Sequence, residues 1–167
     1  MIASGLFYGT VMLLLYVSYI DITSLRIPNL AVVAVAACFA PFAVAIQMPV
    51  VEFGLHVATG LVVLAVGFLL FSIGLRFGGG DAKLFAALAL WCGFKYLLLF
   101  FVVMSLTGGG VAVIVFALRQ FGIPVWLAAH GWSIPALDID KGKAFVPYAP
   151  AMSLAFVYIG LSGLLHA

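Results

Sequence analysis

The sequence predicts an all-α, polytopic integral membrane protein with about six transmembrane helices, folded as a single membrane-embedded domain over residues 1–167. Three observations predict this class: 67% of the residues are apolar, only 7% are charged, and long apolar runs recur along the chain. A soluble domain has about 25% charged residues, so this chain is too poor in charge to cover a water-facing surface. It also lacks the basic stripe that a nucleic-acid-binding surface needs, so no nucleic-acid partner is expected.

The first half of the chain divides into three membrane-crossing helices. Such a helix needs about 20 mostly apolar residues, because its backbone must satisfy its own hydrogen bonds in hydrocarbon. The first predicted helix, residues 2–20, is ended by Asp21, and we expect it to be retained because no basic region precedes it. The second predicted helix, residues 30–47, follows Pro28, and the third covers residues 54–75.

The apolar run after residue 81 is too long for one helix and offers two places for a break, 93–95 and the glycine triplet 108–110. The first place is favoured because Lys95 prefers a membrane interface, whereas a glycine triplet suits close helix packing inside the membrane. We therefore predict a short fourth helix and a longer fifth one, at residues 82–92 and 96–118.

The last predicted helix covers residues 147–165, and a weakly polar stretch, residues 119–145, precedes it. Trp126 and Trp132 lie in this stretch, and tryptophan favours the headgroup region of a membrane. The stretch is therefore predicted to be an interfacial loop rather than a separate folded domain.

The distribution of cations predicts the orientation. Six crossings place both termini on one side and sort the cations into two groups. Only Lys95 falls on one face, and the other face receives Arg26, Arg76, Lys83, Arg119, Lys141 and Lys143. The positive-inside rule makes the richer face cytoplasmic, so both termini are expected to be extracytoplasmic. With this orientation, Asp21 and Asp81 both lie at the cytoplasmic face, and the loop 119–145 is cytoplasmic as well.

Asp21 and Asp81 are the strongest candidates for chemistry among the five acidic residues. Asp138 and Asp140 lie beside lysines in the loop and Glu52 flanks the third helix, so ordinary surface roles account for these three. The two candidates also have ordinary interpretations when each is taken alone. Asp21 can simply mark a helix end, and Asp81 follows three glycines, where an aspartate often caps the next helix.

Taken together, the two acids predict a shared function. Two carboxyls brought close in a poorly solvated cleft cannot both ionise easily, so one keeps its proton at neutral pH. An aspartic protease uses such a pair: the ionised carboxylate takes a proton from the attacking water, and the protonated carboxyl polarises the scissile carbonyl. Two other interpretations stay open at this point. The pair can line an ion or proton path in a small transporter or channel, or serve a structural role in a membrane assembly subunit.

Four segments of the sequence resemble the type IV prepilin peptidase family. Residues 78–84 (GGGDAKL) match its GxGD motif, and Asp21 with residues 26–29 (RIPN) resembles its other catalytic element. Residues 91–94 (WCGF) and 146–151 (VPYAPA) are similar to the break after its short helix and the entrance to its last helix. The resemblance implies that Asp21 and Asp81 are the catalytic pair, and that the active-site loop is shaped by Gly78 and Gly80 and tuned by Lys83.

This resemblance implies an aspartyl endopeptidase of the cytoplasmic (inner) membrane. Its expected partners are membrane lipid and a prepilin or pseudopilin substrate with a hydrophobic N-terminal helix, cut after a glycine at the cytoplasmic membrane face. The chain resembles the short, peptidase-only branch associated with Tad/Flp-type pili. Because the paired CxxC motifs of the bifunctional members are missing from the sequence, N-methylation is not expected.

No metal or other cofactor is expected. Cys38 and Cys92 both lie inside apolar runs, which argues against a disulfide framework or a zinc site. His56, His130 and His166 are scattered over three regions without metal-ligand spacing, so they are interpreted as structural or surface residues.

Overall fold

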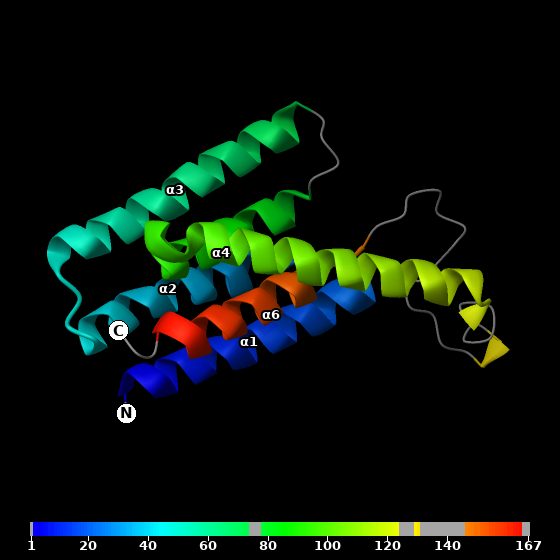
Figure 1. Ribbon diagram of the computed structural model, residues 1–167, viewed down its shortest axis with the longest axis horizontal. Coiled ribbons are helices and arrows are strands. Elements are labelled where there is room, and N and C mark those ends of the chain that lie inside the picture. Colours follow the sequence, from blue (N-terminus) through cyan, green and yellow to red (C-terminus); the bar gives the residue numbers. More distant parts are fainter. Residues whose placement is uncertain (1, 74–77, 124–128, 131–145, 165–167) are drawn as a thin grey trace.

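The structure, a computed structural model, describes residues 2–73, 78–123, 129–130 and 146–164, and every regular element in these residues is helical (Figure 1). The helices are α1 (Ile2–Ser24), α2 (Asn29–Ala45), α3 (Val50–Ser72), α4 (Gly79–Gln120) and α6 (Ala149–Ile159), and α6 continues into a π-helical turn, η2 (Gly160–Leu164). This helical architecture agrees with the predicted fold class.

Successive helices run in opposite directions, so the bundle has two distinct ends (Figure 1). One end collects the C-terminal ends of α1 and α3 and the N-terminal ends of α2, α4 and α6. Asp21 and Asp81 belong to this end, whereas Glu52 belongs to the other. The two aspartates therefore share one end of the bundle, as the alternation of helices predicted.

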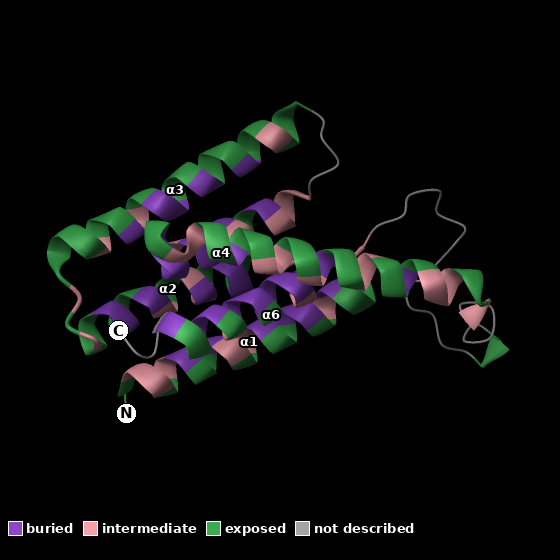
Figure 2. Cartoon of the chain, viewed as in Figure 1, coloured by how far each residue is buried: buried purple, intermediate pink, exposed green. Residues whose placement is uncertain are grey.

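The outer surface of the bundle is apolar. Leu30 and Phe121 are each 82% exposed and Val50 is 86% exposed, and exposed residues cover the outward sides of the helices (Figure 2). A soluble protein rarely exposes so large an apolar surface to water, whereas a helix in hydrocarbon ordinarily has an apolar exterior. Helices α1, α3 and α4 are long and apolar enough to cross a membrane, and α2 and α6 are shorter. The surface agrees with a membrane protein, and the number of six crossings stays a prediction.

Aromatic packing around Trp91 joins α2, α4 and α6. Trp91 is fully buried, and its ring contacts those of Phe39, Phe42 and Phe156. Its indole Nε1 donates a hydrogen bond of 2.9 Å to the carbonyl oxygen of Val35, so the one polar atom of the side chain is satisfied inside the bundle. This cluster supports α4, whose first turn carries Asp81, by packing α2 and α6 against it.

Helix α4 reverses its direction at Gly93, where the backbone has φ 59° and ψ 179°. Residues 79–92 and 94–120 therefore form two helical segments that run back along each other (Figure 1). Only glycine readily adopts this backbone conformation. The structure thus places the break where the sequence predicted it, and the glycine triplet 108–110 continues as regular helix.

Helix α1 extends beyond its predicted end at residue 20, so Asp21 lies inside the helix and does not close it. The prediction was wrong because it assumed that a charged group must mark the membrane boundary, whereas this carboxylate is hydrogen-bonded within the protein. The helix ends at Ser24, and Leu25 adopts a positive φ of 51°. Pro28 follows shortly after and stands at the N-cap position of α2.

Other helix boundaries also differ from the prediction, and the ends of α2 differ by only one or two residues. Helix α3 begins at Val50, directly after Pro49, so Glu52 lies in its first turn and not ahead of it. Helix α4 begins at Gly79, three residues earlier than predicted. Helix α6 begins at Ala149, after Tyr148 as the N-cap residue.

The predicted loop 119–145 is described only in part. Arg119 and Gln120 still belong to α4, so the loop begins later than predicted. Six residues assigned to this loop lie outside the described residues: Trp126, Trp132, Asp138, Asp140, Lys141 and Lys143. Arg76 and His166, from other parts of the chain, also lie outside them.

Candidate active site

Asp21 lies in the last turn of α1 and is buried, with 5% of its surface exposed. Its Oδ2 accepts a hydrogen bond of 3.0 Å from the backbone N–H of Ala149, the first residue of α6. The backbone N–H of Tyr148 also interacts with this carboxylate. Asp21 therefore caps the N-terminus of a helix that lies 128 residues away in the sequence, which explains how an acid is buried at this place.

A buried hydroxyl pair supports this contact one turn deeper in the bundle. Ser18 Oγ and Ser153 Oγ lie 2.9 Å apart and join α1 to α6. The hydroxyl of Ser153 donates to the carbonyl oxygen of Ala149 at 2.8 Å, so Ser153 is linked both to α1 and to the residue that holds Asp21. The serine pair and the contact between Asp21 and Ala149 thus hold the start of α6 against the end of α1.

Asp81 lies in the first turn of α4 and is partly buried. It is close enough to Asp21 for the two carboxyls to interact electrostatically. The structure therefore brings together the two acids that the sequence singled out, although they come from helices α1 and α4 and are separated by two complete helices.

The glycines before Asp81 differ in what a side chain would meet. A Cβ added at Gly78 would collide with Oδ2 of Asp81. A Cβ added at Gly80 would lie 3.2 Å from the Cβ of Ile27, a tight contact, whereas one at Gly79 would make only an ordinary contact of 3.7 Å with Phe71. Gly78 therefore leaves room for the Asp81 carboxyl, and Gly80 lets the turn after α1 pack against α4.

The predicted active-site loop is the start of a helix. Gly78 is the N-cap residue of α4, and Gly80 and Lys83 already lie within its first two turns. The prediction that the helix begins only at residue 82 was wrong, because the glycines continue into the helix where close packing against Ile27 favours a residue without a side chain. That Gly78 and Gly80 shape the active site stays a prediction.

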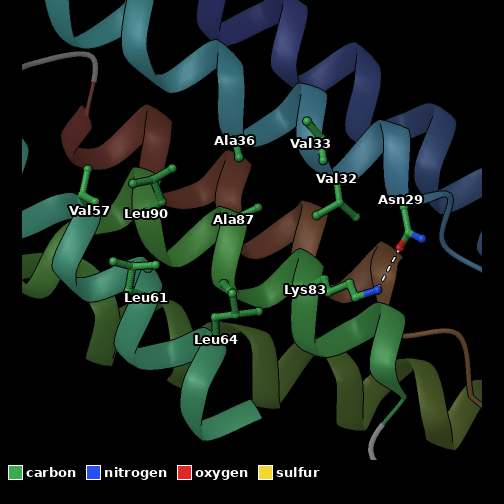
Figure 3. Close-up of a pocket in the computed structure, with 12 residues that line it drawn as sticks. Asn29, Val32, Val33, Ala36, Val57, Leu61, Leu64, Lys83, Ala87 and Leu90 are labelled. Atoms are coloured by element: carbon green, nitrogen blue, oxygen red, sulfur yellow. Dashed lines mark hydrogen bonds between the residues drawn. The ribbon is translucent and has the colours of Figure 1, made fainter. Parts of the chain in front are cut away.

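Lys83 joins α4 to the start of α2. Its ammonium Nζ donates a hydrogen bond of 3.0 Å to Oδ1 of Asn29, and the side chain is exposed (Figure 3). Because residues of an α-helix advance by about 100° each, Lys83 leaves α4 on a different side from Asp81. The predicted tuning of Asp81 by Lys83 stays a prediction.

The remaining candidate residues have structural surroundings. The Nδ1 atom of buried His56 lies 2.8 Å from the carbonyl oxygen of Leu90, and its ring stacks on Phe39. Cys38 and Cys92 are free thiols. Over the described ranges, no three His, Cys, Asp or Glu side chains gather in a way that would hold a metal ion.

Sequence reasoning missed the partners that hold Asp21. Ala149 and Tyr148 lie far from Asp21 in the chain, so only the tertiary structure reveals the contact. One signal was available, because Pro147 and Pro150 mark the start of a helix whose first amides need acceptors. An acid at the same end of the bundle was the natural acceptor.

The arrangement of the two carboxyls is suited to proton transfer. One carboxyl is held by backbone amides, and the other lies within electrostatic reach at the start of a neighbouring helix. Two such groups can hold one proton between them, activate a water molecule and protonate a leaving group.

Comparison with known proteins agrees with this chemistry. The sequence matches the profile of the type IV leader peptidase family over residues 8–113, a span that contains Asp21, Asp81 and the glycines before it. Searches of curated proteins and of solved structures returned no match. Because the matched span covers more than half of the sequence, the chain belongs to the type IV leader peptidase family.

Proposed function

We propose that this protein is a membrane aspartyl endopeptidase that removes the leader of a prepilin or pseudopilin. The cut follows a glycine at the cytoplasmic face of the inner membrane, and the product is not N-methylated. The observation that carries the proposal is the approach of Asp21 and Asp81 at one end of an apolar helical bundle. Membership of the leader peptidase family supports the same reaction class.

In this proposal Asp21 is the general base and Asp81 the general acid. The amides of Ala149 and Tyr148 donate to the Asp21 carboxyl, and such donors stabilise its ionised form. Asp81 then faces a negative charge and keeps the proton of the pair. The different surroundings of the two acids thus give each one a separate role.

The catalytic cycle follows from these roles. Asp21 takes a proton from water as the water oxygen attacks the scissile carbonyl carbon, and Asp81 gives its proton to the carbonyl oxygen. The tetrahedral intermediate then loses its C–N bond as the leaving amine takes the proton from Asp21. Asp81 regains a proton from the intermediate's hydroxyl group, which returns both carboxyls to their starting states.

The branch and the orientation are parts of the same proposal. The sequence holds two cysteines, Cys38 and Cys92, and neither belongs to a CxxC pair, which supports the peptidase-only branch associated with Tad/Flp-type pili. The aspartates share their end of the bundle with Arg26, Lys83 and Arg119. This excess of cations supports a cytoplasmic position for the pair and an extracytoplasmic position for both termini.

Cleavage by the purified protein tests the proposal. The protein is reconstituted into liposomes with a polypeptide that carries a basic leader, a glycine and an apolar helix of about 20 residues. We expect a single cut after the glycine and a product without an added methyl group, both read by mass spectrometry. The same liposomes are assayed for proton and ion flux without substrate. Flux without cleavage would identify a transporter or channel, and the absence of both activities would favour an assembly subunit; either result contradicts the proposal.

Substitution of the glycines before Asp81 should affect cleavage unequally. Gly78→Ala places a Cβ against the Asp81 carboxyl, so we expect a loss of activity of at least about 10²-fold, as when a general acid is displaced. Gly80→Ala requires only a small shift of Ile27 and should have a smaller effect. Initial cleavage rates in liposomes measure both.

Gly79→Ala is the matched control, because its Cβ would make only an ordinary contact with Phe71. We expect it to cleave at close to the wild-type rate. Equal losses in the three variants would show that helix formation at the start of α4, and not the space around Asp81, determines the activity.

A further inference from the structure

An apolar groove lies on the side of the bundle, beside the first segment of α4. Its volume is about 510 Å³, which lies in the range of ligand-binding sites, about 300–1,000 Å³. Helices α2 and α3 form its walls and α4 its floor, and Figure 3 shows their side chains turned toward the space between the helices. The groove is lined by apolar residues except at one end, where Asn29 and Lys83 lie.

The floor and walls contain residues small enough to let another helix approach. Ala86 and Ala87 belong to α4 and Ala36 to α2. Gly60 of α3 also lines the groove, where its lack of a side chain lets α3 pack against Leu90 of α4. Small residues allow two helix backbones to come close in a membrane, where packing rather than hydrophobic burial drives association. The floor runs from Lys83 to Leu90, a length of about 10 Å at 1.5 Å per residue, or two helical turns.

The polar end of the groove is complementary to an anionic group. The ammonium of Lys83 donates to the amide oxygen of Asn29, which is a neutral acceptor. An ammonium at the border of hydrocarbon is stabilised most by an opposite charge. The complementary ligand is therefore an apolar segment with an acidic group at the end that meets Lys83.

The same end of the groove adjoins the candidate catalytic pair. Lys83 follows Asp81 by two positions on α4, and Asn29 closes the Ile27-Pro28-Asn29 turn that packs against Gly80. A chain that leaves the groove at Lys83 therefore needs only to pass the first turn of α4 to reach Asp81. This short path to Asp81 has no consequence for a lipid bound in the groove, whereas it would let a bound substrate reach the catalytic pair.

We infer that the groove between α2, α3 and α4 seats the apolar helix of the substrate, with a carboxylate of that helix at Lys83. This inference rests on the proposed function and adds the place where the substrate is held and the residue that reads its charge. The helix lies in the groove for about two turns, and the segment before it is extended where it passes the first turn of α4.

Leu61 and Val62 offer a matched pair of positions for the test. Both are apolar residues of α3 and both are 61% exposed, but only Leu61 lines the groove. A photoreactive amino acid is placed at either position, and the protein is reconstituted with the leader–glycine–helix polypeptide described above, with one glutamate in the first turn of its helix. We expect crosslinks to the polypeptide from position 61 and crosslinks to lipid from position 62.

Filling the groove tests the same inference through activity. Leu61→Trp should lower cleavage of the polypeptide by at least about 10-fold, because an added ring occupies the seat of a helix, whereas Val62→Trp should cleave like the wild type. Equal cleavage by the two tryptophan variants, with lipid crosslinks alone from position 61, overturns the groove and leaves the peptidase intact. If the wild-type protein does not cleave the polypeptide, the proposed function fails. The crosslinks from position 61 then still show whether the polypeptide or lipid occupies the groove.

The carboxylate contact is tested by a double-mutant cycle. Lys83→Gln and replacement of the polypeptide's glutamate by glutamine should each reduce kcat/KM by about 5- to 10-fold, the size expected for one polar contact between membrane helices. Together they should cost no more than either change alone. Additive losses would show that Lys83 does not meet this carboxylate and would overturn that part of the inference.

Discussion

Asp21→Asn and Asp81→Asn should each abolish measurable cleavage while the bundle stays folded. Neither amide can serve as the base or acid of the pair, and general acid–base catalysis contributes about 10²- to 10⁴-fold for each group. The fold should survive Asp21→Asn because the oxygen of the new side-chain amide can still accept the hydrogen bond from Ala149 N–H. Cleavage of the leader-bearing polypeptide in liposomes and thermal unfolding in detergent measure the two effects.

Glu52→Gln is the control for these two variants. Glu52 is an acidic residue in the first turn of α3, at the opposite end of the bundle, so we expect wild-type cleavage. Cleavage at the wild-type rate by either aspartate variant contradicts a mechanism with two aspartates. Loss of the folded state together with activity would instead show that Asp21 acts mainly through its contact with α6.

Gly93→Ala should destabilise the protein more than any other exchange of a glycine in α4. The backbone at Gly93 has φ 59° and ψ 179°, a region that costs a residue with a side chain about 1–3 kcal/mol. A Cβ there would also lie 2.6 Å from Cε1 and Nε2 of His56, whose ring cannot move freely because it is buried and its Nδ1 contacts Leu90. We expect a lower midpoint of thermal unfolding in detergent, with a parallel loss of cleavage.

Gly109→Ala and Gly110→Ala provide the controls for the reversal. Both residues lie in regular helix of the same element, and a Cβ at either position meets nothing within 4 Å. Alanine should stabilise the helix there by up to about 1 kcal/mol. The double variant His56→Ala/Gly93→Ala removes the collision but keeps the backbone cost, so it should recover only part of the loss. If Gly93→Ala unfolds like Gly109→Ala, the reversal of α4 does not depend on glycine at this position.

The helical class and the break in α4 were predictable because they depend on short stretches of sequence. Apolar runs of sufficient length predict helices, and Gly93 beside Lys95 indicates a helix end at an interface. The meeting of Asp21 and Asp81 at one end followed from the alternation of helices alone. These predictions needed no knowledge of which helices are neighbours.

The predicted helix ends were less accurate because they treated charged and glycine residues as boundaries. The charge of Asp21 predicts the end of the first helix, but its carboxylate is satisfied by the amide of Ala149 and the helix continues. The glycines before Asp81 predict a helix start only at residue 82, but their lack of side chains lets α4 begin earlier, against Ile27. In both cases the helix continues because of a contact between segments that are distant in the sequence. The local sequence alone predicts solvent or a turn at these places.

The sequence by itself determined the helical membrane class, the family resemblance and the choice of Asp21 and Asp81, because composition, apolar run length and motif spacing are properties of the chain. Only the tertiary structure decided which groups surround these acids. The amides that hold Asp21, the serine pair beneath it and the groove that ends at Lys83 arise where α1 meets α6 and where α2 and α3 pack on α4. Such neighbours are selected by side-chain packing between helices, and no periodicity within one helix records its partners.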